Sequence, residues 1–119
     1  MTLTLTILGC GSSGGVPRVG QGWGACDPAD PRNRRRRCAL LVETTGPGGA
    51  TTVLVDTGPD VREQLLSAGV TRVDGVIYTH DHADHTHGID DLRPLALTMR
   101  RRVEAYADDA TRTTLEARF

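Results

Sequence analysis

The residues best suited to chemistry in this sequence lie within seven positions, from Thr79 to His85. Three imidazoles and two carboxylates follow an apolar run there, and they are His80, Asp81, His82, Asp84 and His85. Imidazole and carboxylate groups are common protein ligands of zinc and other divalent metals. The spacing His-x-His-x-Asp-His offers four ligands within six residues, which suits two adjacent ions better than one. The segment therefore predicts a two-metal site.

The directions of the side chains support this interpretation. In an extended segment, side chains two residues apart point the same way, so His80 and His82 can reach one ion. If the chain turns into a helix near Asp84, the consecutive Asp84 and His85 can face a second ion. Two ions about 3.5–4 Å apart can deprotonate a bridging water and hold the attacking and leaving oxygens. The alternatives are a polar surface loop and a single adventitious metal site.

The motif His80-x-His82-x-Asp84-His85-x-x-Gly88 resembles the signature of the metallo-β-lactamase superfamily of di-metal hydrolases. The run Asp56–Gly58, which closes an apolar segment, fits the same family. Three further runs resemble the branch that contains the cyclic phosphodiesterase of phosphonate utilisation, close to the tRNA 3′-processing endonucleases. These runs are residues 9–17, 26–35 and 88–94.

The resemblance implies a role for each matching residue. His80 and His82 would bind the first metal, and Asp84 and His85 would bind the second. Asp84 would also orient the attacking hydroxide, which makes it the expected catalytic residue. Asp56 is expected to brace the histidine loop from behind. The implied cofactors are two divalent ions, with zinc as first choice and manganese or iron as alternatives.

Local patterns predict the elements that position these residues. The expected strands cover residues 2–8, 38–44, 51–56, 73–78 and 103–107, and a turn covers 46–49. The expected helices cover residues 60–68, 89–97 and 110–119, with Asp60 as N-cap of the first and an interruption at Pro94 in the second. With the resemblance, this order predicts an α/β fold: a mixed sheet with helices on one face, half of a four-layer αββα sandwich.

The set of ligands is incomplete by comparison with the family. Its members add a third histidine for the first metal, a bridging aspartate and a last histidine, all from the C-terminal half of the sandwich. No histidine follows His87 here. We therefore expect residues 1–119 to form the N-terminal portion of one domain, weakly active or inactive without the other half.

Charge and cysteine content indicate which kinds of binding partner and which cellular compartment to expect. The net charge of −1 argues against general binding to nucleic acids or membrane surfaces. Three cysteines without CxxC spacing fit a reducing cytoplasm, and no signal peptide or membrane span is recognisable. Arg34, Arg35 and Arg37 could bind a phosphate group, or they could belong to a solvated loop that pairs with Asp27 and Asp30.

We therefore expect a metal-dependent hydrolase, first of all a phosphodiesterase that attacks with a hydroxide held by two ions. A small phosphodiester or nucleotide-like substrate is favoured over RNA, because no RNA-binding arm is recognisable. The alternatives are a non-catalytic fragment that needs its missing half or a homo-oligomer, and a superfamily member acting on tRNA, a thioester or a cofactor-biosynthesis intermediate.

Overall fold

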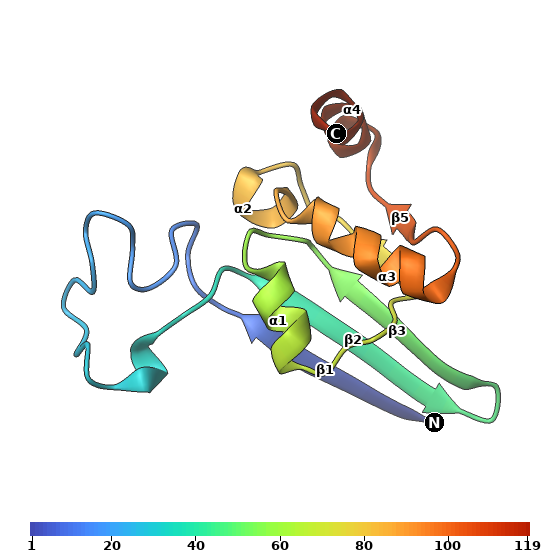
Figure 1. The fold of residues 1–119 in the computed structure, drawn as a ribbon, viewed down its shortest axis with the longest axis horizontal. Helices are drawn as coiled ribbons and strands as arrows, with labels where there is room; N and C mark the ends of the chain where they lie inside the picture. Colours follow the sequence, from blue (N-terminus) through green and yellow to red (C-terminus); the bar gives the residue numbers. More distant parts are fainter.

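The computed structural model describes all residues from 1 to 119 and has a five-stranded sheet at its centre (Figure 1). The strands are β1 (Thr2–Gly9), β2 (Ala39–Gly46), β3 (Gly49–Val55), β4 (Gly75–Ile77) and β5 (Glu104–Tyr106). The α-helices are α1 (Val61–Ser67), α2 (Ala83–Thr86), α3 (Leu92–Met99) and α4 (Asp109–Arg118). Two short 3₁₀ helices are η1 (Pro31–Asn33) and η2 (Ile89–Asp91).

The sheet is mixed, as the sequence predicts. β1, β2 and β3 are antiparallel neighbours, whereas β3, β4 and β5 run parallel. A tight turn joins β2 to β3, because Gly46 pairs directly with Gly49. Parallel neighbours need crossover connections, and the segments that contain α1 and α3 supply them. The predicted α/β class is confirmed.

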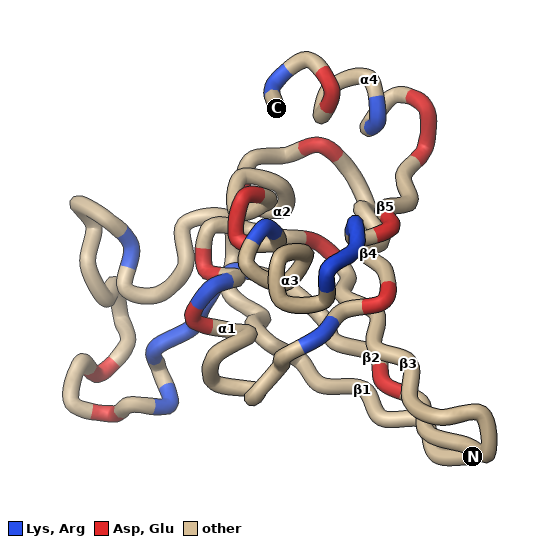
Figure 2. The backbone as a smooth tube through the Cα atoms, turned by 45° about the vertical axis from the view of Figure 1, so that its right-hand side comes forward, with Lys and Arg blue, Asp and Glu red and all other residues tan.

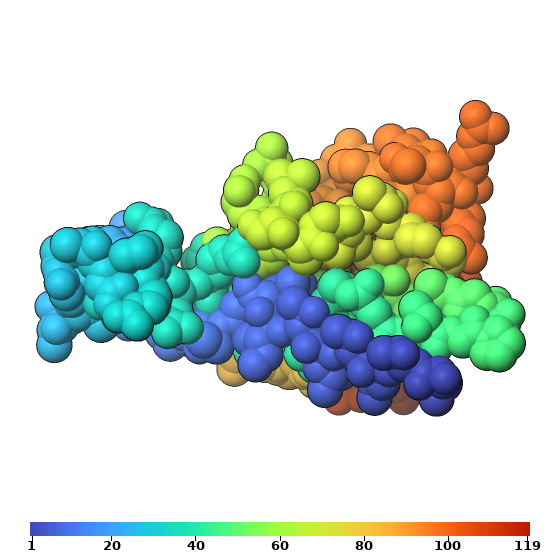
Figure 3. All heavy atoms as spheres, turned by 90° about the horizontal axis from the view of Figure 1, so that it is seen from below, coloured from blue at the N-terminus to red at the C-terminus, as the bar shows by residue number.

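One face of the sheet forms the core. Leu41, Leu54 and Val76 occupy neighbouring positions on β2, β3 and β4, and all three are fully buried. Val61 and Leu65 of α1 belong to the same core cluster. Seen edge-on, α1 and α3 stand together over this face (Figure 3). The prediction of helices on one face is confirmed.

The opposite face carries an apolar row that remains open to solvent. The register aligns one residue from each strand across the sheet, and the row is Ile7, Leu40, Val55, Ile77 and Tyr106. Residues directly opposite in adjacent strands project from the same face. Ile7 is 72% exposed, Ile77 44% and Tyr106 59%, and Leu3 and Leu5 extend the apolar surface along β1. We call this surface the open face.

One local prediction is wrong, and another holds only in part. Pro94 does not interrupt a helix, because it is the third residue of α3. Amide hydrogens in the first turn of a helix have no intrahelical partner, so proline costs little there. Asp60 is the N-cap residue of α1, as predicted, but its side chain makes no capping bond. Its carboxylate instead accepts hydrogen bonds from the Arg37 backbone amide, Nε and Nη2, at 2.8–2.9 Å.

The Arg37–Asp60 pair makes stability depend on pH. The Arg37 guanidinium holds the pKa of the Asp60 carboxyl below its usual value. A depressed folded-state pKa adds stability above the unfolded value of about 3.9, and this stability is lost as the pH falls through the folded value. We expect Asp60→Asn to cost about 1 kcal/mol at pH 7, because both side chains remain about a quarter exposed.

Urea unfolding of both proteins at pH 7, 5 and 3.5 tests this prediction. The difference in unfolding free energy should shrink toward the lowest pH, where a protonated Asp60 resembles asparagine. A difference that stays constant across this range would contradict it.

None of the helices is both long enough and apolar enough to span a bilayer.

Candidate metal centre

The histidine segment lies at the edge of the sheet where β3 and β4 end. The two strands are parallel, so their carboxyl ends meet at the same edge. Asp56 follows β3 directly, and Thr79 and His80 follow β4. The chain then turns into α2, which carries Asp84 and His85 as the sequence predicts. Figure 1 shows α2 beyond this end of the sheet.

Asp56 is buried behind the histidines, with only 3% of its surface exposed. Its Oδ1 accepts the Thr79 backbone amide at 2.8 Å, and its Oδ2 accepts the Thr79 hydroxyl at 2.7 Å. Oδ2 also lies 2.7 Å from Nδ1 of His85. The backbone of Asp56 is left-handed, with φ of 66°, a conformation that aspartate and asparagine tolerate better than most residues. The residue therefore joins both strand ends to α2.

These bonds determine which imidazole nitrogens are free. His85 Nδ1 must carry a proton to donate to the Asp56 carboxylate, which leaves Nε2 unprotonated in the neutral ring. The Thr79 hydroxyl gives its proton to Asp56, so it can only accept from Nδ1 of His80, 2.8 Å away. Asp56 thus fixes one histidine directly and the other through Thr79. In both rings Nε2 is available to a metal ion.

The rings of His80, His82 and His85 and the Asp84 carboxylate are close neighbours. The His80 ring centroid lies 4.5 Å from that of His82 and 4.2 Å from that of His85. Oδ2 of Asp84 lies 3.2 Å from Nε2 of His85. The structure therefore brings together all four residues predicted as ligands. His87 turns away, and its ring packs edge-on against Phe119 at 5.7 Å.

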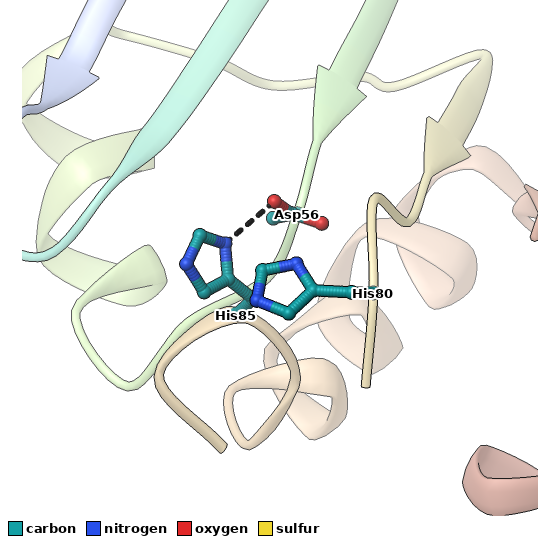
Figure 4. A group of neighbouring side chains, drawn as sticks. All are labelled: Asp56, His80 and His85. Carbon is teal, nitrogen blue, oxygen red and sulfur yellow. Dashed lines mark hydrogen bonds and ion pairs between the residues drawn. The ribbon is translucent and has the colours of Figure 1, made fainter. Parts of the chain in front are cut away.

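The most compact set of metal-binding atoms differs from the predicted grouping. Ligand atoms of Asp56, His80 and His85 lie within 4.8 Å of one another (Figure 4). The two Asp56 oxygens, however, already accept hydrogen bonds from Thr79 and His85. A carboxylate occupied in this way orients ligands better than it binds metal. The chemistry of the donor set fits divalent ions at His80, His82, Asp84 and His85.

Close backbone packing holds α2 against the turn after β3. Thr57 donates its amide to the His85 carbonyl at 2.9 Å and accepts the Gly88 amide at 2.8 Å. A Cβ on Gly88 would collide with the Gly58 carbonyl oxygen, and a Cβ on Gly58 would collide with the Asp84 carbonyl oxygen. The glycines of both motifs are therefore required by this contact.

Four consecutive arginines, 34–37, form an arginine run, and residues 9–17 form a glycine-rich loop. The arginine run lines a cleft of about 370 Å³ between the glycine-rich loop and the start of α1. Figure 2 shows the basic positions of this run beside α1. Arg34 and Arg35 are exposed, and the Arg34 guanidinium lies over the Trp23 ring at 5.6 Å. Arg37 is held by Asp60, whose hydrogen bond raises the Arg37 pKa, with a smaller contribution from the charge of Asp84.

The expected pairing of the arginines with Asp27 and Asp30 is found only in part. Asp27 pairs with no arginine, because its carboxylate caps the Ala29 amide, whereas Asp30 pairs with Arg32. The glycine-rich loop approaches the arginine run, since the Gly11 amide donates to the Arg36 carbonyl at 2.8 Å.

The sequence did not predict the role of Thr79, whose hydroxyl links the Asp56 carboxylate to the His80 ring. The only available signal was its position, directly before the first histidine and after an apolar strand.

A family comparison agrees with this geometry. The profile described as the β-lactamase superfamily domain matches residues 51–119, a span that contains Asp56, the histidine segment and Gly88. The chain belongs to the β-lactamase superfamily. The predicted superfamily membership and the predicted fold are thereby confirmed.

Individual proteins also resemble this chain. An octanoyltransferase from Porphyromonas gingivalis is 39% identical over 102 residues, which cover 86% of this chain and 20% of that protein. A ribonuclease Z from Methanopyrus kandleri is 38% identical over 88 residues, or 69% of this chain and 29% of that protein. The crystal structure of a diphosphatase from the PhnP family is 41% identical with a TM-score of 0.88, covering 99% of this chain and 46% of that one.

The family match and these similarities establish the general class of the protein. The chain is a member of a hydrolase family with the metallo-β-lactamase fold, and the family binds divalent metal ions. It spans less than half the length of the relatives it matches.

Proposed function

We propose that this β-lactamase superfamily chain carries the first half of a two-metal site that hydrolyses a small phosphodiester. One observation supports the proposal most directly: the Asp56–Thr79–His80 and Asp56–His85 bonds leave Nε2 free in both rings, and the Asp84 carboxylate lies 3.2 Å from Nε2 of His85. Such preorganisation is what metal ligands require. Zinc is the first choice of metal, with manganese or iron as alternatives.

The residues would divide the work as follows. Divalent ions held here would supply Lewis acidity and lower the pKa of a water molecule. His80 and His82 would hold one ion, and Asp84 and His85 the other. The Asp84 carboxylate would also accept a hydrogen bond from the attacking water and so orient it. Arg34 and Arg35 form no salt bridge and would help to neutralise phosphate charge, although Arg35 also contacts the Cys10 sulfur, whereas Arg37 is engaged with Asp60.

A second polypeptide segment would complete the site. Catalytic zinc has three protein ligands, and His80 and His82 supply only two. The open face offers an apolar surface to a second layer of structure. We therefore propose that residues 1–119 form the N-terminal portion of one domain and that a C-terminal half covers this face, with a homo-oligomer as the alternative.

The choice of substrate rests on two supports. The chain is 41% identical to a diphosphatase and 38% identical to a ribonuclease Z, and both names imply cleavage of phosphate esters or anhydrides. The arginine-lined cleft is compatible with an anionic substrate.

The cysteines bear on the cellular compartment. Three exposed free cysteines suit a reducing compartment, and we propose the cytoplasm.

A phosphodiesterase assay tests the proposal. The 119-residue chain should bind Zn²⁺ or Mn²⁺ weakly in calorimetry, and His82→Ala should abolish that binding. Hydrolysis of bis(p-nitrophenyl) phosphate should be slight and should depend on the added metal. Strong turnover by the chain alone would refute the need for a second half, and the absence of metal binding would refute the site.

A variant and its matched control test whether the arginines bind substrate without affecting the metal site. Replacing both Arg34 and Arg35 with alanine should raise KM for an anionic diester and leave metal affinity unchanged. Arg32→Ala, in the same loop but paired with Asp30, serves as the control.

A further inference from the structure

Asp81 lies between the two histidines proposed to share an ion, yet its side chain is engaged elsewhere. Side chains alternate along an extended segment, so Asp81 projects away from His80 and His82. Its Oδ2 accepts the hydroxyl of Thr114 in α4 at 3.0 Å. A carboxylate in the middle of a metal-binding motif thus contacts a helix that begins 28 residues later, at Asp109.

A second bond from α4 reaches the same residue. Nη1 of Arg118 donates to the backbone carbonyl of Asp81 at 2.7 Å. Thr114 and Arg118 are one helical turn apart, so they present their donors on the same side of α4. The helix therefore holds both the side chain and the peptide group that links Asp81 to His82.

The histidine loop is consequently supported from two sides. On the inner side, Asp56 holds Thr79 and His85. On the outer side, Asp81 contacts α4, and Thr86 of α2 donates to the His82 carbonyl at 3.0 Å. Residues 79–82 lie outside any helix or strand, so these bonds limit where His80 and His82 can point.

We propose that α4 is the outer support of the metal-binding loop, with Asp81, Thr114 and Arg118 as positioning residues that set the spacing of His80 and His82. The inference rests on the proposed metal site. It also distinguishes Asp81 from the neighbouring carboxylate Asp84, since Asp81 would act through its contacts with α4 and not as a ligand. Groups that orient metal ligands typically contribute about 10–100-fold to metal affinity.

Metal affinity in the full 119-residue chain tests the proposal, measured by competition with a chromogenic zinc chelator. Asp81→Ala should weaken Zn²⁺ binding by roughly tenfold or more. Asp81→Asn should bind nearly as well as the wild type, because its amide oxygen can still accept the Thr114 hydroxyl. Equal losses in both variants would mean that Asp81 is itself a ligand and would overturn the proposal.

Variants in α4 give a second test. Thr114→Val and Arg118→Ala should each weaken binding several-fold, and Thr114→Ser should restore it. Arg112→Ala is the matched control, because Arg112 lies on the same helix and pairs only with Glu116. Unchanged affinity in Thr114→Val and Arg118→Ala would also overturn the proposal.

Hydrogen exchange in the metal-free chain provides a readout that needs no ion. In Thr114→Val and Arg118→Ala, the amides of residues 80–82 should exchange faster than in Arg112→Ala, while those of the β2–β3 pair stay protected. If the wild type fails to bind zinc but its loop shows this dependence on α4, the proposed function fails and the support by α4 stands. Identical exchange in all three variants would refute that support.

Discussion

Replacing Asp56 with alanine is expected to reduce metal affinity by about 10–100-fold and to destabilise the chain by about 3 kcal/mol. The carboxylate is buried and accepts bonds from the Thr79 amide, the Thr79 hydroxyl and His85 Nδ1. Alanine would leave these donors without a partner and would also occupy a left-handed backbone position. Zinc competition and urea unfolding measure the two effects.

Asp56→Asn separates the two effects, because asparagine keeps the shape of the side chain and tolerates the left-handed backbone. If its amide group donates to His85 Nδ1, the ring must carry its proton on Nε2, the nitrogen that would face the metal. We therefore expect a smaller loss of stability than in Asp56→Ala but a comparable loss of affinity. An Asp56→Asn chain that binds zinc as well as the wild type would contradict the proposed control of the tautomer.

The ligand pattern could be predicted from the sequence because the four residues are neighbours in it. His80, His82, Asp84 and His85 fall within six positions, and the alternation of an extended segment followed by a helix is enough to orient them. The approximate positions of the strands were also predictable from local patterns, whereas their arrangement as a mixed sheet followed from the family resemblance. Local chemistry therefore specified most of the elements and the centre of the candidate site.

The contacts that hold these ligands were not predictable, because they join distant parts of the chain. Asp60 has the type and position of an N-cap, but the ion pair with Arg37, 23 residues earlier, takes its carboxylate. Asp81 is the spacer between two predicted ligands, and the partner of its carboxylate, Thr114, lies 33 residues later. A local pattern cannot indicate which of two competing partners a carboxylate selects once the chain has folded.

Gly88→Ala is expected to cause the largest loss of stability of any single methyl addition near the site, at least about 3 kcal/mol. The new Cβ would collide with the Gly58 carbonyl oxygen and would lie 2.7 Å from Cγ1 of Val61, a fully buried core residue. Neither neighbour can move easily, because one is backbone and the other is packed under the sheet. The melting temperature should fall by roughly 10 °C or more.

The expected loss would extend to metal binding, because the Gly88 amide donates to Thr57, which in turn donates to the carbonyl of His85. Moving α2 outward to relieve the collision would carry Asp84 and His85 away from His80. Gly48→Ala is the matched control, since a Cβ there meets open space. Calorimetric melting and zinc competition on both variants test the prediction, and a Gly88→Ala chain as stable as Gly48→Ala would refute it. If Gly88→Ala is destabilised as expected, the glycine of the motif is explained as a packing requirement of the ligand helix, because only a residue without a Cβ fits against the Gly58 carbonyl oxygen.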